Sequence, residues 1–575
     1  MKLDEVLETI GQFGRYQKII FVLICIPGIS CGIVMTLAVI LLGIPNHRCR
    51  LPGYENDTYS IQDATHQEHV SRYIPPPAAD DSSLLYDKCH TYSYNASNTK
   101  FDNSSHPINA TLVKCTSWVY DDSEFYETFV SKHDLVCGDH YKVSTAKTIY
   151  FGGVLVGALI FGSLSDGIGR KKTINVSIAL LFASSIGLAW APNYIAYVVL
   201  RFLAGMAFSG TFITAYVIGV EIVGPSKRKY TGIINEIFFA FGECFLAGVG
   251  FLVRDWHYVE IIIAAPMVLY LSYWWLIPES PRWLINKGRF DEAEEILRKA
   301  AKINKKELPA KILDRDIRDD TKTEKVYKIF TSRILFIRTL IILYVNHLIQ
   351  LIMANKMFMY DFFCFRMVVS MTYYGLTLNS GNLSGDVYLN FFFSGMVEFP
   401  AYIISIIFLD RLGRRTLHCI MMLTGGLACL STIFTVLYGG EDLQTLTTVL
   451  ALVGKLGSSA GFALIYIYSA ELFPTVLRNA AIGIFSCGAR VGGMVAPLIA
   501  DSVIIIGGKM GQAVPLVIFG AASVLAGILT LFLPETLNSR LPETIEDARL
   551  FGTEKYKQKE KELHNISGEE STTKF

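Results

Sequence analysis

Long apolar runs recur along the whole chain, and short polar or charged turns separate them. A helix needs about 20 mostly apolar residues to cross the hydrocarbon core of a bilayer. The pattern therefore predicts an all-α protein that crosses a membrane many times. With the long stretch that starts at 334 counted once, it predicts twelve spans, of which the others are 19–43, 143–164, 173–191, 195–217, 231–252, 258–277, 386–409, 416–438, 445–469, 476–500 and 513–533.

The stretch 343–376 does not fit a single straight span. Its 34 residues would extend about 51 Å as a helix, whereas the hydrocarbon core is about 30 Å thick. It also carries Lys356, Asp361 and Arg366, and such side chains each cost about 2.5–3.5 kcal/mol near the centre of a membrane helix. Two complete spans here would reverse the orientation of everything that follows, including the basic turn after Asp410.

Removal of 347–366 would join 338–346 to 367–376 as one span of ordinary length with a basic start. We therefore interpret 347–366 as an insertion that leaves the topology unchanged. If these residues belong to the working protein, we expect the seventh span to be disturbed. An inactive form is then an alternative to a working transporter.

The basic turns set the predicted orientation, because Lys and Arg collect in cytoplasmic loops. Arg170, Lys227 and Arg415 lie in such turns, whereas 191–194 carries no positive charge. Both termini are therefore predicted to be cytoplasmic in a plasma-membrane protein. The predicted parts are a cytoplasmic N-terminus 1–18, a first six-helix half 19–277 with an external segment 44–142, a cytoplasmic linker 278–333, a second half 334–533 and a cytoplasmic tail 534–575.

The external segment carries two further signals of an extracellular environment. It holds four Asn-X-Ser/Thr acceptor sites for glycosylation, at Asn56, Asn95, Asn103 and Asn109. It also holds four cysteines, and an even number in an oxidising compartment predicts two disulfides. Three pairings are open for these residues, which are Cys49, Cys89, Cys115 and Cys137.

Composition narrows the function classes. The chain is 51% hydrophobic and 18% charged, with a net charge of +1, so it lacks the basic excess that nucleic-acid binding requires. It contains no phosphate-binding G-x-x-x-x-G-K-[ST] motif, no H-E-x-x-H motif and no plausible metal-ligand cluster. We therefore expect no enzyme activity, no cofactor and no metal site. Transport energy would come from solute or ion gradients.

The two halves repeat each other at their cytoplasmic turns. Glycines permit tight turns between helices, and Asp and Arg side chains there can pair across helix ends as latches between two states. Pro278-Glu-Ser closes the sixth span, and Pro534-Glu-Thr closes the twelfth. The matched latch residues are Gly162, Asp166, Arg170, Glu221 and Arg228 in the first half, and Asp410, Arg411, Arg414, Glu471 and Arg478 in the second.

These motifs resemble the major facilitator superfamily over the whole chain. More narrowly, PESPRWLINKGRFDEAEEIL at 278–297, FFFSGMVEFP at 391–400, AELFPTVLRN at 470–479 and PETLNSRLPET at 534–544 resemble the organic cation, organic anion and carnitine transporter family. PESPRWL alone also fits sugar-type carriers, which remain an alternative. The resemblance implies a major-facilitator-type bundle of twelve transmembrane helices in two pseudo-symmetric six-helix halves, which would work by alternating access.

Ionisable side chains inside spans are costly, and each is therefore a candidate for function. Arg490 either binds a substrate carboxylate, the reading we favour, or pairs with an internal acid such as Glu398. Tyrosines could offer ring faces to an ammonium group. The predicted substrate-binding residues are Arg490, Glu398, Tyr373, Tyr374, Tyr466, Lys455 and Glu243.

The resemblance sharpens the reading of Arg490. Cation carriers of the family typically hold an acidic residue at this position, whereas anion and carnitine carriers hold arginine. We therefore expect a small organic ion or zwitterion, moved across the lipid bilayer with sodium or protons as the possible coupling ion. The alternative from another class is a membrane receptor or scaffold that does not transport.

Overall fold

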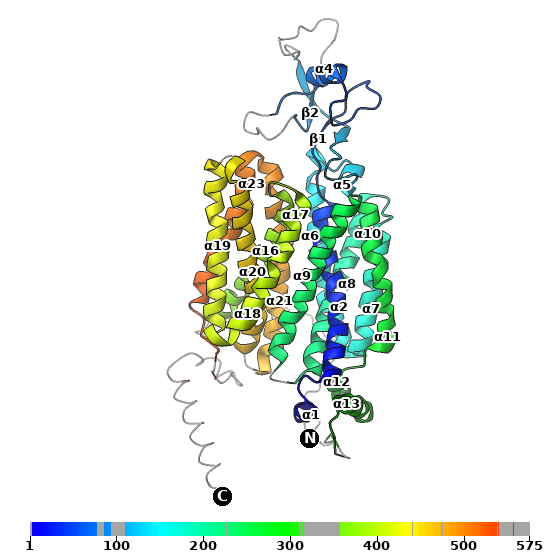
Figure 1. Ribbon diagram of the computed structural model, residues 1–575, viewed down its shortest axis with the longest axis vertical. Coiled ribbons are helices and arrows are strands. Elements are labelled where there is room, and N and C mark those ends of the chain that lie inside the picture. The colour runs from blue at the N-terminus through cyan, green and yellow to red at the C-terminus, as the bar shows by residue number, and fades with distance from the viewer. Residues whose placement is uncertain are drawn as a thin grey trace, which may run out of the picture.

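A computed structural model describes residues 3–77, 86–93, 110–224, 227–309, 312–313, 357–439, 441–472, 475–537, 539 and 556. Two helix bundles stand side by side in it, the first half of the chain in blue to green and the second in yellow to orange (Figure 1). The described residues of the segment 44–142, here called the loop domain, project from one end, which we call the loop-domain end. Helix α1 and helices α12 and α13 lie at the opposite end, here called the basic end.

The first bundle is built from long apolar helices joined by short turns. Polar side chains cap several of them: Asn193 Oδ1 accepts the Ala196 N–H, and Asp255 accepts the His257 N–H. The elements are α2 (Arg15–Thr36), α3 (Ala38–Leu41), α6 (Tyr141–Ile168), α7 (Arg170–Leu188), α8 (Tyr194–Ile222), α9 (Arg228–Val253), α10 (Trp256–Ala264), η3 (Ala265–Ser272) and α11 (Tyr273–Leu276).

The second bundle repeats this arrangement. Its elements are α16 (Met357–Asn379), η4 (Ser380–Asn382), α17 (Val387–Met396), α18 (Glu398–Leu412), α19 (Arg414–Tyr438), η5 (Glu441–Leu443), α20 (Gln444–Leu472), α21 (Thr475–Ala500), α22 (Ser502–Ile506) and α23 (Gly508–Thr530).

Ten segments in the described part of the chain are long and apolar enough to cross a membrane. Two further helices stand where the remaining predicted spans were expected. Helix α7 begins with Arg170 and two lysines, and α16 contains Asp361 and Arg366, so neither helix is purely apolar. Together with these two helices, the described segments are consistent with the twelve predicted spans.

The structure places part of the predicted insertion inside a helix. Residues 357–366 form the first part of α16 and continue directly into 367–379. At 23 residues α16 is about 35 Å long, enough to cross the core. Residues 357–366 and 367–376, which the prediction divided between the insertion and the seventh span, are thus parts of one helix. Residues 338–346 and 347–356 lie outside the described residues.

Glycine contacts reveal the internal repeat at atomic level. A methyl group at Gly242 of α9 would lie 2.1 Å from the carbonyl oxygen of Ile29 in α2. A methyl group at Gly492 of α21 would lie 2.1 Å from the carbonyl oxygen of Met367 in α16. Only glycine permits such approach of two backbones. The same helix pair is thus packed by the same device in both halves.

The two bundles meet along what we call the seam. On one side α6 packs against α21, and on the other α9 packs against α17 and α18. The seam is tight: a methyl group at Gly493 of α21 would lie 2.6 Å from the Phe151 ring of α6.

The loop domain is held by two disulfides and two small antiparallel sheets. Cys49 pairs with Cys115 and Cys89 with Cys137, which resolves the three predicted alternatives. Strand β1 (His47–Cys49) pairs with β4 (Trp118–Tyr120), and β2 (His90–Ser93) pairs with β3 (Thr111–Lys114). Helices α4 (Ala64–Tyr73) and α5 (Phe129–Lys132) and the turn η1 (Cys137–Asp139) complete the domain.

A buried charged cluster organises the loop domain. Arg48 Nη2 lies 2.5 Å from Asp57 Oδ1, and His66 Nε2 lies 3.0 Å from the same oxygen. Burial raises the pKa of Asp57, but hydrogen bonds from Arg48, the Leu51 N–H and His66 outweigh it and hold the pKa below its ordinary value. Asn56 next to it is exposed; the other three predicted glycosylation sites lie outside the described residues.

Three helices cover the basic end: α1 (Leu3–Thr9), α12 (Pro281–Asn286) and α13 (Phe290–Asn304). Asp4 of α1 lies 2.5 Å from Arg228 Nη2 and 2.7 Å from Arg282 Nη2. Burial raises the pKa of Asp4, yet the two arginines outweigh it and keep the pKa below its ordinary value. One carboxylate thereby ties the first turn of the chain to α9 and α12.

Candidate functional site

The predicted residues Glu398 and Lys455 form a buried ion pair inside the second bundle. Lys455 Nζ lies 2.6 Å from Glu398 Oε1, and the two side chains are 2% and 0% exposed. Tyr402 Oη donates to Glu398 Oε2 at 2.9 Å, and the Ser459 hydroxyl reaches Oε1 at 3.4 Å. Both charges are thus satisfied within the protein, and Glu398 does not pair with Arg490.

Tyr373 belongs to the same cluster. Lys455 Nζ lies 3.7 Å from the centroid of its ring and also donates to Thr377 Oγ1. The ring is stacked on Phe462 with centroids 4.7 Å apart. Tyr373 is 1% exposed, so in this conformation its ring contacts other residues of the protein rather than open space.

Glu243 lies on the seam, opposite this pair. Its side chain is fully buried, and neither carboxylate oxygen has a hydrogen-bond partner among the described residues. A methyl group at Gly395 of α17 would lie 3.1 Å from Glu243 Cβ, so the second bundle touches α9 at this residue. Glu236, two turns earlier on α9, is also buried. Both acids are within electrostatic range of Glu398.

Arg490 stands at a second, basic position in the second bundle. It is partly exposed, and its Nη1 donates to the Ser486 carbonyl oxygen at 2.7 Å and to the Ser486 hydroxyl. Its Nε has no hydrogen-bond partner in the described part of the chain. The guanidinium of Arg366 lies near it, stacked 3.8 Å from the centroid of the Tyr466 ring.

Tyr374 of α16 is an aromatic contact between the two bundles. Its ring lies 5.1 Å from Phe151 of the first bundle and 5.7 Å from Phe462 of the second. An aromatic side chain of the second bundle thus lies against the first bundle on the seam.

At the basic end, the latch residues of the first half form one network. Arg170 Nη2 lies 3.1 Å from Glu221 Oε1, and its Nη1 lies 3.0 Å from Asp166. Glu279 Oε1 accepts the backbone N–H groups of Arg170 and Lys171 at 2.8 and 3.1 Å. This carboxylate caps the start of α7, where the helix dipole favours a negative charge.

The second half repeats this network. Arg414 Nε lies 3.0 Å from Glu471 Oε2, and its Nη1 lies 3.4 Å from Asp410. The backbone N–H groups of Arg414 and Arg415 donate to the two oxygens of Glu535 at 2.8 and 3.1 Å. The same ion pairs and the same helix cap therefore occur in both halves, and their role as latches stays a prediction.

The remaining latch residues take different places. Arg228 pairs with Asp4 rather than with Glu221, Arg411 is exposed, and Gly162 lies within α6 before its end. The side chain of Arg478 lies outside the described residues.

Sequence reasoning missed the role of Glu279 and Glu535. The signal was present, because both stand in the repeated Pro-Glu turn.

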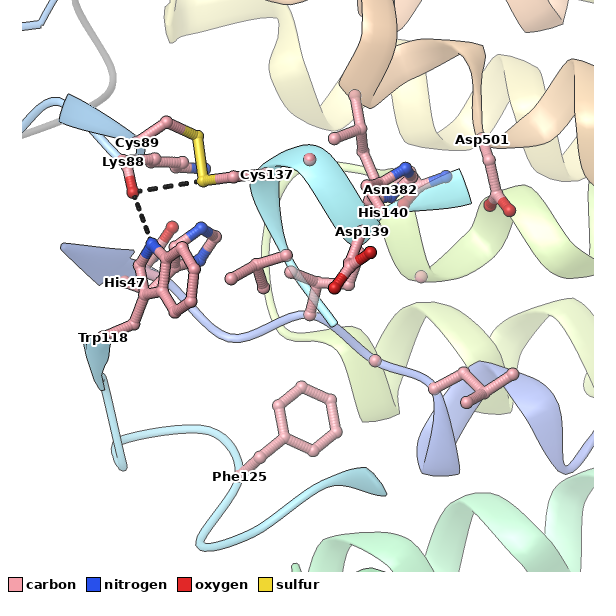
Figure 2. A pocket seen from close by; sticks show the side chains of 18 of the residues that line it. His47, Lys88, Cys89, Trp118, Phe125, Cys137, Asp139, His140, Asn382 and Asp501 are labelled. Atoms are coloured by element: carbon pink, nitrogen blue, oxygen red, sulfur yellow. Dashed lines mark hydrogen bonds between the residues drawn. A yellow bond between two sulfur atoms is a disulfide. The ribbon is translucent and has the colours of Figure 1, made fainter. Parts of the chain in front are cut away.

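A cavity of about 1090 Å³ opens at the loop-domain end. Figure 2 shows the Cys89–Cys137 disulfide on one side of it and Asp501 on the other. Beside it, Lys147 Nζ of α6 lies 2.7 Å from Asp501 Oδ1 at the end of α21, and Ser144 Oγ donates to Oδ2 at 2.6 Å. This ion pair ties the two bundles together across the seam.

Comparisons with known proteins agree with this architecture. Residues 109–547 match the family model described as "Sugar (and other) transporter". The chain is 38% identical to the "Organic cation transporter protein" of Drosophila melanogaster, over 96% of this chain and 95% of that protein. It is 33% identical to the human "Organic cation/carnitine transporter 2", over 94% of this chain and 93% of that protein.

Solved structures give the fold. The xylose transporter XylE from E. coli, in a partially occluded inward-open conformation, superposes with a TM-score of 0.56 at 15% identity. The match covers 92% of this chain and 100% of that one. The chain therefore has the major facilitator fold, with two pseudo-symmetric halves.

Proposed function

Because the chain belongs to the organic cation, organic anion and carnitine transporter family and is thus a membrane transporter of small organic ions, we propose that it carries a small zwitterion of the carnitine type. Its substrate would bind on the seam, with its carboxylate at Arg490 and its ammonium group toward the acids of α9. The observation that carries this proposal is that Arg490 is partly exposed with described hydrogen bonds to Ser486 alone, while the buried carboxylate of Glu243 on the seam has no hydrogen-bond partner among the described residues.

The carboxylate end of the substrate would meet Arg490. A guanidinium can donate two parallel hydrogen bonds to a carboxylate, which gives both strength and orientation. Arg490 is partly exposed, and its described hydrogen bonds go to Ser486 alone, so no protein carboxylate competes for it among the described residues. Arg366 nearby adds a second positive charge.

The ammonium end would meet Tyr374 and the acids Glu236 and Glu243. A cation over an aromatic face gains up to about 2 kcal/mol when both are desolvated. Glu398 is less suited to this role in the present conformation, because Lys455 and Tyr402 already occupy its oxygens. We infer that the Glu398–Lys455 pair instead holds α18 against α20.

Transport would proceed by alternating access, in which the two bundles rock about the seam. The matched networks at Arg170 and Arg414 support this, since each ties helices within one half and lets that half move as a unit. We place the protein in the plasma membrane with both termini in the cytoplasm, because the basic turns and the disulfide-bonded loop domain lie at opposite ends.

Uptake by the purified full chain in proteoliposomes tests this proposal, with labelled carnitine, tetraethylammonium and p-aminohippurate as probes. We expect carnitine to be carried best. Arg490→Asp should lower carnitine and p-aminohippurate uptake at least tenfold and spare tetraethylammonium, whereas the control Arg490→Lys should keep part of the carnitine uptake. If Arg490→Asp leaves carnitine uptake unchanged, the assigned site is wrong.

The same assay decides between the other readings. A receptor or scaffold that does not transport, or a form inactivated by 347–366, would carry none of the probes. A sugar-type carrier would accumulate a labelled hexose instead.

A further inference from the structure

Glu243 poses an electrostatic problem that the proposed function does not solve. It is fully buried, and both of its carboxylate oxygens lack a hydrogen-bond partner among the described residues. An unpaired buried carboxylate is so unfavourable that such a group takes up a neutralising partner. When no substrate is bound, that partner must come from solution.

The surroundings of Glu243 are acidic. Three carboxylates, those of Glu236, Glu243 and Glu398, lie in this region with one ammonium group, that of Lys455. The ammonium group already pairs with Glu398, so it does not neutralise the other two carboxylates. Among the described residues, α2, α8, α10 and α17 bring no charged side chain to Glu243. The titratable groups that do face it are Glu236 and Cys244 of α9, Tyr373 of α16, Glu398 and Tyr402 of α18, and Lys455 of α20.

The surroundings of Glu243 fit a proton as the neutralising partner better than they fit a metal ion. A metal cation takes several oxygen ligands, and the described part of the chain holds no group of three or more Asp, Glu, His or Cys residues that could bind one. A proton needs a single oxygen. It converts the carboxylate into a neutral acid, and this acid can remain in an apolar contact.

The place of Glu243 on the seam makes this binding state-dependent. Gly395 of α17 lies so close that a methyl group there would meet Cys244 Sγ at 2.9 Å and Glu243 Cβ at 3.1 Å. Rocking of one bundle against the other must change this contact. The carboxylate would then be exposed to water on one side of the membrane, where it can lose its proton.

We propose that Glu243 is a proton-binding site that couples substrate movement to the proton gradient by exchange. This rests on the proposed function, since the ammonium group of the substrate would neutralise Glu243 in place of the proton. The carboxyl O–H bond breaks when the ammonium arrives, and the proton goes to water. The proton rebinds when the substrate leaves, so that one proton and one substrate travel in opposite directions.

Carnitine uptake into proteoliposomes under an imposed pH gradient tests this, with the membrane potential clamped. For one-proton exchange, an interior more acidic by one pH unit should raise accumulation up to tenfold. The response is expressed as a ratio to uptake by the same variant without a gradient. We expect this ratio to fall to about one in Glu243→Gln, and to persist in Glu243→Asp.

Glu260→Gln is the matched control. Glu260 of α10 is equally buried, and its oxygens also lack partners in the described residues, but it lies within the first bundle rather than on the seam. It should keep the full response to the gradient. If Glu260→Gln loses the response as Glu243→Gln does, or Glu243→Gln retains it, the proposal is overturned.

Two further measurements cover the other outcomes. If the Glu243 variants do not reach the membrane, a pH-sensitive dye outside wild-type proteoliposomes provides the test. Carnitine added outside must then release protons from inside, and the absence of proton release overturns the proposal. A response to a sodium gradient in place of a proton gradient overturns it too. Wild-type protein that carries carnitine without any pH response contradicts this inference alone, whereas absence of all uptake contradicts the proposed function.

Discussion

Replacing Lys455 with methionine would remove the positive charge from the most deeply buried ion pair of the second bundle. Glu398 would then keep Tyr402 and Ser459 as hydrogen-bond donors but lose a counter-ion at 2.6 Å. Breaking such a pair on one side costs about 3–5 kcal/mol, because it leaves a buried charge uncompensated. The ratio of folded to unfolded protein would therefore fall by about two to three and a half orders of magnitude.

The double variant Glu398→Gln/Lys455→Met leaves no charge behind. Uncharged replacements of a buried pair are often neutral in stability, so we expect it to recover most of the loss. Thermal unfolding of the purified protein in detergent measures this, with Lys509→Met as control, since Lys509 is exposed and its loss should change little. The reasoning is refuted if Lys455→Met melts at the wild-type temperature, or if the double variant is no more stable than the single one.

Three further substitutions test other parts of the structure. The pKa of Asp57 in the folded protein lies below its ordinary value of 3.8, so the ionised carboxylate stabilises the loop domain above pH 3.8, and this stability is lost as the pH falls through the lower folded value. Hydrogen exchange of the loop domain, measured as a function of pH, should show this loss in the wild type and not in Asp57→Asn. Identical pH profiles for the two proteins would contradict this role of Asp57. Gly395→Leu should cut carnitine uptake at least tenfold at equal surface expression, because even a methyl group there meets Cys244 Sγ at 2.9 Å; normal uptake would rule out this contact as part of the cycle. Glu535→Ala and Glu279→Ala should each lower stability toward thermal unfolding by about 0.5–2 kcal/mol through loss of a helix cap. A loss in only one of them would contradict the matched roles of the two halves.

Local sequence patterns were sufficient to predict the long apolar helices and the paired charges at the basic end. The repeated turns predicted that Asp and Arg pair at the helix ends, and Asp166 pairs with Arg170 as Asp410 does with Arg414. The further pairs of these arginines with Glu221 and Glu471 were not predicted. The patterns worked because helix length and turn chemistry are set by neighbouring residues. The same repeat contains Glu279 and Glu535 in its Pro-Glu turns. Their role as helix caps could not be predicted from the sequence, because it depends on where the folded chain places the backbone N–H groups that they accept.

Contacts between distant segments could not be predicted in this way. The four loop-domain cysteines allowed three pairings, and the choice depends on how β1 and β4 fold over the chain. Likewise, the partner that the sequence suggested for Glu398 was Arg490, and the structure gives that role to Lys455. The stretch before Met367 was misleading for a different reason: its charges suggested a segment outside the span, but Arg366 is buried against the Tyr466 ring.

The central claim is that the two bundles open alternately on either side of one pocket. Its most direct test is a cross-link across the seam at the loop-domain end, where Lys147 and Asp501 touch at 2.7 Å. A short membrane-impermeant bifunctional thiol reagent would be applied to Lys147→Cys/Asp501→Cys, with each single variant as control. We predict that cross-linking abolishes carnitine uptake and that cleavage of the linker restores it. Uptake that continues at the uncross-linked rate while the two bundles are joined would contradict alternating access.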